Sequence, residues 1–425
     1  MFIHPPSPVH KRWAILIALL ACAIALPSLA KDKKNAQPAD PKPDRLLFDI
    51  RKLVWPNPPA VARIRYVAML TGEKIDHTPK NPNQKAKKSW MDRLAGAQPI
   101  EEQNIKIPIQ FIRVFGVAVD SHGDIYAADQ GVDAIFIVNS DSKAISFIRN
   151  GHEARFGMIN GLAMDDGDRL FVSDTKLRKI LVFNAKHEQE ASFGAEMLVS
   201  PAGIAIDKEN RFLYVVDTQK DQVLVFDADN YKLLRTIGTT GKNHQLTDPG
   251  NFALPTNVAV DKEGDVYVTD TLNNRVEIFD ADGNFISTFG KAGDGAGQFE
   301  RPKGIAVDCD GHIWVVDGAQ NRFKVFDRQG RLLIYIGETG TYPGQFDSPY
   351  GIAIDKDNRV IVSEQFPGRV QVFKYVTDAE AEKARSGKVA EASPSPTPAP
   401  APPPAPPKDA PATAASAATK GSAAH

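Results

Sequence analysis

The segment at residues 265–280, DVYVTDTLNNRVEIFD, holds three aspartates around one arginine. Asp270 and Arg275 are close enough in sequence to form a charged site that could take part in acid–base chemistry. Acidic residues occupy the position of Asp270 in five other segments, at 129, 174, 217, 317 and 364. A carboxylate that recurs at the end of the same strand is predicted to cap a turn by accepting backbone N–H groups. We therefore expect these residues to shape the fold and function to lie where the segments differ.

These segments are copies of one repeat. Six copies of the pattern GIAVD, turn, YVTD, turn, RVEIFD begin near residues 115, 160, 202, 256, 303 and 350. The aspartates that close their first strands lie 42 to 54 residues apart. Val, Ile, Phe and Tyr alternate with polar residues, and Gly, Asn and Asp separate the runs, which predicts four short antiparallel strands per copy. A period in the forties without a helical pattern is typical of a propeller. The sequence predicts an all-β, six-bladed β-propeller.

Closure of such a ring requires a fourth strand in every blade, because an unpaired edge strand promotes aggregation. The sixth copy ends after RVQVFKYV without one, whereas RIRYVAMLTG at 63–72 shows the alternation of a strand followed by glycine. We predict that this N-terminal strand completes the last blade. The propeller would then span 63–376, with an unusually long connector at 73–110.

The repeat unit GIAVDxxGxxYVxDxxNxRVxxFDxxGxxxxxFG resembles the NHL repeat, and the fourth and fifth copies match it best. The resemblance covers about residues 63–376. The order of segments, with WPNPPAVARIRY before the repeats and DRLAG in the connector, also resembles exported bacterial six-bladed propellers of NHL type. This resemblance implies the fold but not one activity, because such rings include binding modules, lyases and lactonases.

The N-terminal segment predicts export. Basic residues, the apolar run at 13–26 and small residues before Lys31 have the layout of a secretory signal peptide over 1–30. The apolar run is shorter than the ~20 residues of a membrane-spanning helix. The alternative is a lipoprotein signal over 1–21, because LLAC resembles a lipobox in which Cys22 would be lipidated. Both alternatives predict the periplasm or cell envelope.

Two further regions lie outside the repeats. Residues 31–62 are predicted to be a flexible spacer followed by an outer segment. Residues 377–425 are rich in Ala and Pro and lack large apolar side chains, so they are predicted to be a disordered tail. The formal net charge of -1 lacks the basic bias of nucleic-acid-binding proteins, which argues against such a partner.

One position at the start of the first strand differs in every copy. Since the first strand of a propeller blade lines the central channel, these six residues are predicted to ring one mouth of the channel. The ring comprises Phe115, Asn160, Ala202, Thr256, Lys303 and Tyr350. Such a mixture could stack on and hydrogen-bond a small polar molecule or a peptide, or it could only hold water. Turn residues predicted on the same face form a polar, mildly basic rim: Lys176, Arg178, Lys220, Asn274, Gln320 and Phe366.

The resemblance also raises the question of a metal. NHL-type amidating lyases and lactonase-like propellers hold a divalent metal in the channel with His, Glu, Asp or Asn ligands. His152 and His244 lie in connections between copies, but no second ligand stands at a useful spacing. We predict no catalytic residue and no cofactor, with zinc or calcium expected only under the alternative of a metal-dependent lyase or lactonase-type hydrolase.

The leading prediction is a non-catalytic, monomeric binding scaffold of the bacterial cell envelope. It would contact a protein, a peptide or a cell-wall glycan through the channel mouth. It would bind no nucleic acid and would touch a membrane only through a lipid on Cys22.

Overall fold

The computed structural model describes residues 49–73, 109–152, 154–240, 244–383 and 385. The predicted signal peptide, Cys22, most of the long connector and most of the Ala/Pro-rich tail lie outside these residues. The start of the predicted tail is described, and residues 378–383 are helical there. No helix in the described part of the chain is long and apolar enough to cross a membrane.

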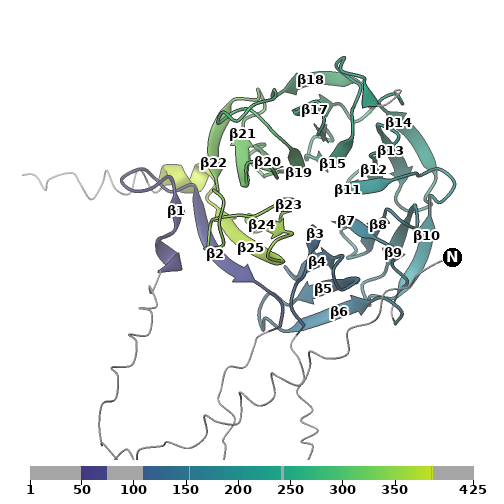
Figure 1. Cartoon of the computed structure of the whole chain (residues 1–425), viewed down its shortest axis with the longest axis horizontal. Coiled ribbons are helices and arrows are strands. Elements are labelled where there is room, and N and C mark those ends of the chain that lie inside the picture. The colour runs from purple at the N-terminus through teal and green to yellow at the C-terminus, as the bar shows by residue number, and fades with distance from the viewer. Residues whose placement is uncertain (1–48, 74–108, 153, 241–243, 384, 386–425) are drawn as a thin grey trace, which may run out of the picture. The chain divides into compact units, whose positions relative to one another are not determined.

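Short β-sheets are arranged as blades around a ring (Figure 1). Five blades contain four antiparallel strands from one repeat, and the sixth contains five strands. Blades 1 to 3 consist of β3 (Val114–Val119), β4 (Ile125–Asp129), β5 (Ala134–Val138), β6 (Ile145–Arg149); β7 (Ile159–Met164), β8 (Leu170–Asp174), β9 (Lys179–Phe183), β10 (Gln189–Phe193); β11 (Pro201–Asp207), β12 (Phe212–Asp217), β13 (Gln222–Asp227) and β14 (Leu233–Ile237). Blades 4 to 6 consist of β15 (Pro255–Val260), β16 (Val266–Asp270), β17 (Arg275–Phe279), β18 (Phe285–Phe289); β19 (Pro302–Val307), β20 (Ile313–Asp317), β21 (Arg322–Phe326), β22 (Leu332–Ile336); β23 (Pro349–Ile354), β24 (Arg359–Glu364) and β25 (Arg369–Tyr375). The predicted six-bladed propeller is confirmed.

An N-terminal strand closes the ring, as predicted. Strand β2 (Ile64–Leu70) pairs antiparallel with β25, and the pairing runs from Ile64 opposite Tyr375 to Leu70 opposite Val370. Its alternation places Ile64 and Tyr66 in the core. The short strand β1 (Val54–Trp55), preceded by the 3-10 helix η1 (Ile50–Lys52), adds a fifth strand outside β2.

The first strand of each blade is innermost (Figure 1). Adjacent inner strands approach so closely that a Cβ on Gly304 of β19 would lie 2.5 Å from the carbonyl oxygen of Tyr350 on β23. The glycine of the GIAVD pattern therefore permits the close packing of neighbouring blades around the channel.

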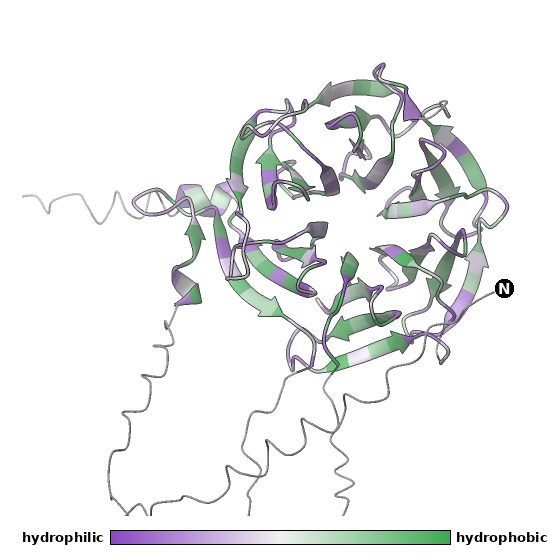
Figure 2. Cartoon of the chain, in the orientation of Figure 1, coloured by the Kyte–Doolittle hydropathy of each residue, from purple (hydrophilic) through white to green (hydrophobic). Residues whose placement is uncertain are grey.

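Apolar side chains fill the space between neighbouring blades. Ile135 and Ile148 of blade 1, for example, share one buried cluster with Leu170 and Leu181 of blade 2. Hydrophobic residues dominate the strands and hydrophilic residues the turns (Figure 2). The alternating pattern of each repeat thus builds a series of interfaces between blades.

Asp270 and Arg275 form a structural pair. Asp270 is fully buried, accepts the N–H of Ala253 at 2.7 Å and accepts a bond from Arg275 Nε at 3.0 Å. Arg275 also donates to the carbonyl oxygens of Thr247 and Asn251. The corresponding acids of the other blades likewise accept backbone N–H groups from the connections that precede the inner strands: Asp129, Asp174, Asp217, Asp317 and Glu364. These carboxylates anchor connections between blades.

The third strands of blades 4 to 6 contain buried polar side chains that the alternation pattern did not reveal. Glu277, Lys324 and Gln371 are all 0% exposed. Glu277 accepts the N–H of Gly250 at 2.7 Å, Gln371 accepts that of Gly344 at 2.9 Å, and Lys324 donates to a carbonyl of the connection before blade 5. Each side chain fixes a glycine-containing connection onto the blade that the connection enters.

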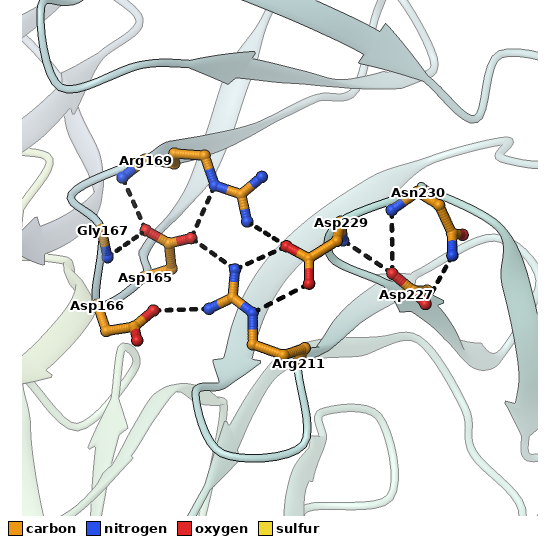
Figure 3. A network of polar contacts seen from close by, with 8 residues as sticks. All are labelled: Asp165, Asp166, Gly167, Arg169, Arg211, Asp227, Asp229 and Asn230. Carbon is orange, nitrogen blue, oxygen red and sulfur yellow. Dashed lines mark hydrogen bonds and ion pairs between the residues drawn. The ribbon is translucent and has the colours of Figure 1, made fainter.

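An ion network joins the turns of blades 2 and 3 (Figure 3). The guanidinium of Arg211 lies 2.9 Å from Asp165, 2.6 Å from Asp166 and 2.9 Å from Asp229. Arg169 contacts Asp165 at 2.8 Å and Asp229 at 2.7 Å. Burial opposes ionisation of Asp165, but hydrogen bonds from the two arginines lower its pKa below the ordinary value. The network clamps two blades on the face opposite to the connections between blades.

Candidate functional site

The six predicted ring residues stand at equivalent places in the structure. Each is the second residue of its innermost strand, on the face formed by the connections between blades. We call this face the mouth face. Five of the six are at most 9% exposed, and Lys303 is partly buried: Phe115, Asn160, Ala202, Thr256 and Tyr350 are the buried five.

Tyr350 lies across the mouth of the channel. Its hydroxyl donates to Asn160 Oδ1 at 3.1 Å, so blade 6 is bonded to blade 2, and the Phe115 ring packs 4.6 Å from the Tyr350 ring. Burial raises the pKa of Tyr350 to about 12. The phenol is therefore a neutral donor near pH 7.

The channel beneath Tyr350 is narrow. A hollow of about 40 Å³ is lined by Gly116, Asn160, Asn257, Tyr350 and Gly351. This volume suits a few water molecules, because one water requires about 10–15 Å³ of such space. A larger ligand would rest on the mouth and not enter the channel.

Lys303 carries an uncompensated charge at this mouth. Its Nζ lies 5.8 Å from the centre of the Tyr350 ring, and no hydrogen bond or ion pair joins it to another described residue. Burial lowers the pKa of Lys303 to about 8, and the nearby charge of Arg301 acts in the same direction. The amine is still mostly protonated at pH 7, so an incoming anion would gain a charge partner there.

Arg113 adds a second cation, which the sequence analysis missed. Its guanidinium lies 5.3 Å from the ring centre of Phe115 and 5.9 Å from that of Phe366. The side chain is exposed, and no carboxylate in the described part of the chain pairs with it. Arg113 stands in the connection that enters blade 1, two positions before a ring residue.

The other ring residues contribute less to binding. Thr256 Oγ1 hydrogen-bonds Thr271 Oγ1 at 2.7 Å, which ties two parts of blade 4 together. Ala202 offers no polar group. The ring residues that offer aromatic, charged or hydrogen-bonding groups to a ligand are therefore Phe115, Lys303 and Tyr350, together with Asn160.

Four of the predicted rim residues bind backbone carbonyls of connections between blades. The donors are Arg178 Nε to Leu198 at 3.1 Å, Lys220 Nζ to Met197 at 2.5 Å, Asn274 Nδ2 to Glu300 at 2.7 Å and Gln320 Nε2 to Gly293 at 2.8 Å. Lys176 and Phe366 are exposed and remain the rim residues available to a ligand.

Exposed apolar side chains surround the mouth. They lie in turns and connections of the mouth face, and seven large ones are 37–69% exposed: Ile112, Val132, Met158, Val199, Leu272, Tyr342 and Phe366. We call them the apolar collar. The sequence could have indicated the apolar collar, because Val132 and Leu272 stand in turns where polar residues are usual.

The predicted histidine candidates lie in different connections between blades. His244 Nδ1 lies 2.7 Å from Asp221 Oδ1 in blade 3, whereas His152 lies in the connection that enters blade 2. Within the described ranges, no group of three or more His, Cys, Asp or Glu side chains could hold a metal ion. The ring itself provides no imidazole and no carboxylate, so its residues do not fit a metal centre.

Comparison with known proteins agrees with the fold. A family model described as a 6-bladed beta-propeller matches residues 151–248 and 247–323. The chain is a six-bladed β-propeller. A structural genomics protein of unknown function from Bacteroides thetaiotaomicron is 17% identical, with a TM-score of 0.52 over 62% of this chain and 70% of that chain. At this identity the likeness shows the fold alone.

Two curated animal proteins are similar in sequence to part of the propeller. A probable peptidyl-alpha-hydroxyglycine alpha-amidating lyase of Caenorhabditis elegans is 30% identical over 156 residues, 36% of this chain and 43% of that protein. The mouse peptidyl-glycine alpha-amidating monooxygenase is 28% identical over 214 residues, 49% of this chain and 19% of that protein. The chain thus spans less than half of either relative. The relatives include lyase-type enzymes, and membership of the NHL family stays a prediction.

Proposed function

We propose that the protein is a non-catalytic binding propeller whose mouth face holds an acidic peptide or protein segment. The observation that carries the proposal is the pair of cations, Lys303 and Arg113, which have no counter-ion among the described residues and lie against aromatic rings. A carboxylate of the partner would bond to the cations, and its apolar groups would pack on Phe115, Tyr350 and Phe366.

The chemistry of the ring supports binding over catalysis. Tyr350 is a neutral phenol engaged by Asn160, and the ring offers no carboxylate or imidazole to exchange a proton. The 40 Å³ hollow below leaves no room for a substrate inside the channel. A ligand would contact the mouth over a broad, shallow surface, which is typical of recognition of a macromolecule.

The apolar collar favours a peptide or protein over a glycan. Exposed Ile, Val, Met, Leu and aromatic side chains match apolar side chains of a partner, whereas sugars depend mainly on hydrogen bonds. The relatives named for peptidyl substrates support the same choice. A cell-wall glycan remains the other outcome of a binding experiment.

Selection from a random peptide library on the purified protein tests this proposal. Peptides that combine acidic and apolar residues should be enriched. Each of Lys303→Gln and Arg113→Gln should weaken their binding about tenfold or more, because each removes a charged contact. Lys208→Gln, an exposed cation on the opposite face, is the matched control and should bind as the parent does. Equal affinity of all three variants would contradict the proposed site.

The second candidate function is that of a metal-dependent lyase or lactonase-type hydrolase, which the similarity to the amidating lyase favours. Elemental analysis of protein purified without chelators separates the two. Stoichiometric zinc or calcium would replace the binding proposal by the enzyme proposal. A metal content below about a tenth of the protein concentration would support the proposal of a non-catalytic binding protein.

We further propose that the protein acts as a monomer in the periplasm or cell envelope after export. The signal-like N-terminal sequence supports this location. The intact mass of protein from the native host distinguishes a chain that begins at Lys31 from one that begins at a lipidated Cys22. A mass that retains residues 1–30 unmodified would contradict both forms.

A further inference from the structure

A second candidate site lies on blade 2, away from the channel mouth. Blades 4 to 6 provide the comparison for this site, because in each of them the connection that enters the blade lies against the third strand. The buried side chains of Glu277, Lys324 and Gln371 hold these connections at the middle of β17, β21 and β25. The connections span residues 238–254, 290–301 and 337–348, so each has at least twelve residues with which to cover the strand.

Blade 2 departs from this arrangement in two ways. Leu181 stands where blades 4 to 6 have Glu277, Lys324 and Gln371, so no polar side chain draws a connection down. Blades 1 and 3 also have an apolar residue here, Phe136 and Leu224. The connection itself, 150–158, is shorter. A hollow of about 470 Å³ remains in this place, within the range of small-molecule sites of about 300–1,000 Å³.

The residue at the start of the third strand shows the same contrast. Arg275 in blade 4 and Arg369 in blade 6 bond to their own strand-end carboxylate and to carbonyls of the covering connection. Lys179 of β9 holds the equivalent position and lines the hollow of blade 2. No hydrogen bond or ion pair joins its ammonium to another described residue, and Asp174 accepts backbone N–H groups instead.

The rest of the lining gives the hollow its chemistry. Arg155, whose side chain also has no ion pair with the described residues, and His152 come from the connection, and Gln189 comes from β10. Leu181 and Ala154 are buried and form the apolar part of the lining. Two cations and an amide stand beside an apolar surface.

We propose that this hollow binds a small organic anion. A carboxylate or phosphate oxyanion would lie between Arg155 and Lys179, where both can donate charge-assisted hydrogen bonds. The apolar body of the molecule would rest on Leu181 and Ala154 in the space that a connection fills in blades 4 to 6. The site does not depend on the channel mouth, since none of its residues belongs to the ring or the apolar collar.

Titration calorimetry with the full-length protein tests the site. Benzoate and phenyl phosphate serve as probes, and benzyl alcohol serves as the neutral analogue. At least one anion should bind, benzyl alcohol should bind at least about tenfold more weakly, and the stronger anion identifies carboxylate or phosphate as the preferred group.

Variants locate the binding. Lys179→Gln and Arg155→Gln should each weaken the bound anion about tenfold or more. Lys186→Gln removes an exposed charge from the turn between β9 and β10 on the same blade and should change nothing. Failure of both anions to bind at about 10 mM, or equal binding by all three variants, would overturn the proposal. Unchanged melting temperatures confirm that the variants are folded, and peptide binding at the mouth should be intact in each of them.

Discussion

Tyr66 offers a direct test of how the ring closes. Its side chain on β2 is 5% exposed and lies edge-to-face with Phe373 of β25, with ring centres 5.3 Å apart. Tyr66→Ala removes this buried ring from the contact between β2 and β25 that closes the ring of blades. We expect the free energy of unfolding to fall by about 3–5 kcal/mol, the usual cost of truncating a buried aromatic side chain. The melting temperature should fall by roughly 5–15 °C.

Two companion variants give this prediction its control. The Tyr66 hydroxyl is buried without a hydrogen-bond partner among the described residues, so Tyr66→Phe should leave stability unchanged or raise it by about 1 kcal/mol. Val67 is 44% exposed on the same strand, and Val67→Ala should change stability by less than about 0.5 kcal/mol. Thermal and denaturant unfolding followed by circular dichroism measures all three. Equal melting temperatures of Tyr66→Ala and Val67→Ala would mean that β2 and β25 do not pack as the structure shows. An equal loss of stability in Tyr66→Phe and Tyr66→Ala would mean that packing of the aromatic ring is not the cause of the loss.

Two further predictions concern ionic contacts outside the mouth. Arg211→Ala should lower the free energy of unfolding by about 1–2 kcal/mol, because Asp165 keeps Arg169 but loses its second guanidinium, and the difference should shrink at high salt; an equal loss in Lys208→Ala would contradict it. The carboxylate of Asp308, 3.0 Å from His312 Nδ1, raises the pKa of that imidazole above 6.5 against the effect of burial. Its stabilisation is therefore fully present below pH 6.5 and lost as pH rises through the raised value. In thermal melts, His312→Gln should be destabilised most near pH 5.5 and least near pH 8.5, and equal deficits at both would refute this reasoning.

Much of the fold was predictable because it rests on local, repeated patterns. Alternating apolar residues, turn glycines and the period of the copies located the six blades, and the alternation at 63–72 located the closing strand, which the structure places at Ile64–Leu70. The buried side chains of Glu277, Lys324 and Gln371 escaped prediction. A polar residue in an alternating strand is expected to face solvent, and only the connection folded over it makes it internal.

The candidate sites were less predictable because they depend on contacts across blades. The ring positions followed from divergence between copies, but the bond from Tyr350 to Asn160 joins residues 190 positions apart, and no spacing rule finds it. Arg113 gains its role from two aromatic rings, one of which lies in blade 6. The hollow of blade 2 lies beside its third strand, at the place that a connection covers in blades 4 to 6, and this contrast is evident only when the blades are compared in space.

The closing strand also determines when the molecule can finish folding. Ile64 and its partner Tyr375 are separated by roughly 300 residues, so β2 is among the first strands synthesised, whereas its pairing with β25 is among the last to form. At about 5–20 residues per second, a ribosome needs roughly 15–60 s to produce its partner. During this interval β2 can pair only with the short strand β1, and its pairing with β25 over such a distance is intrinsically slow. A chain interrupted anywhere before β25 would leave the edge of β2 that faces β25 unpaired, which makes incomplete chains prone to aggregate even when five blades are already formed.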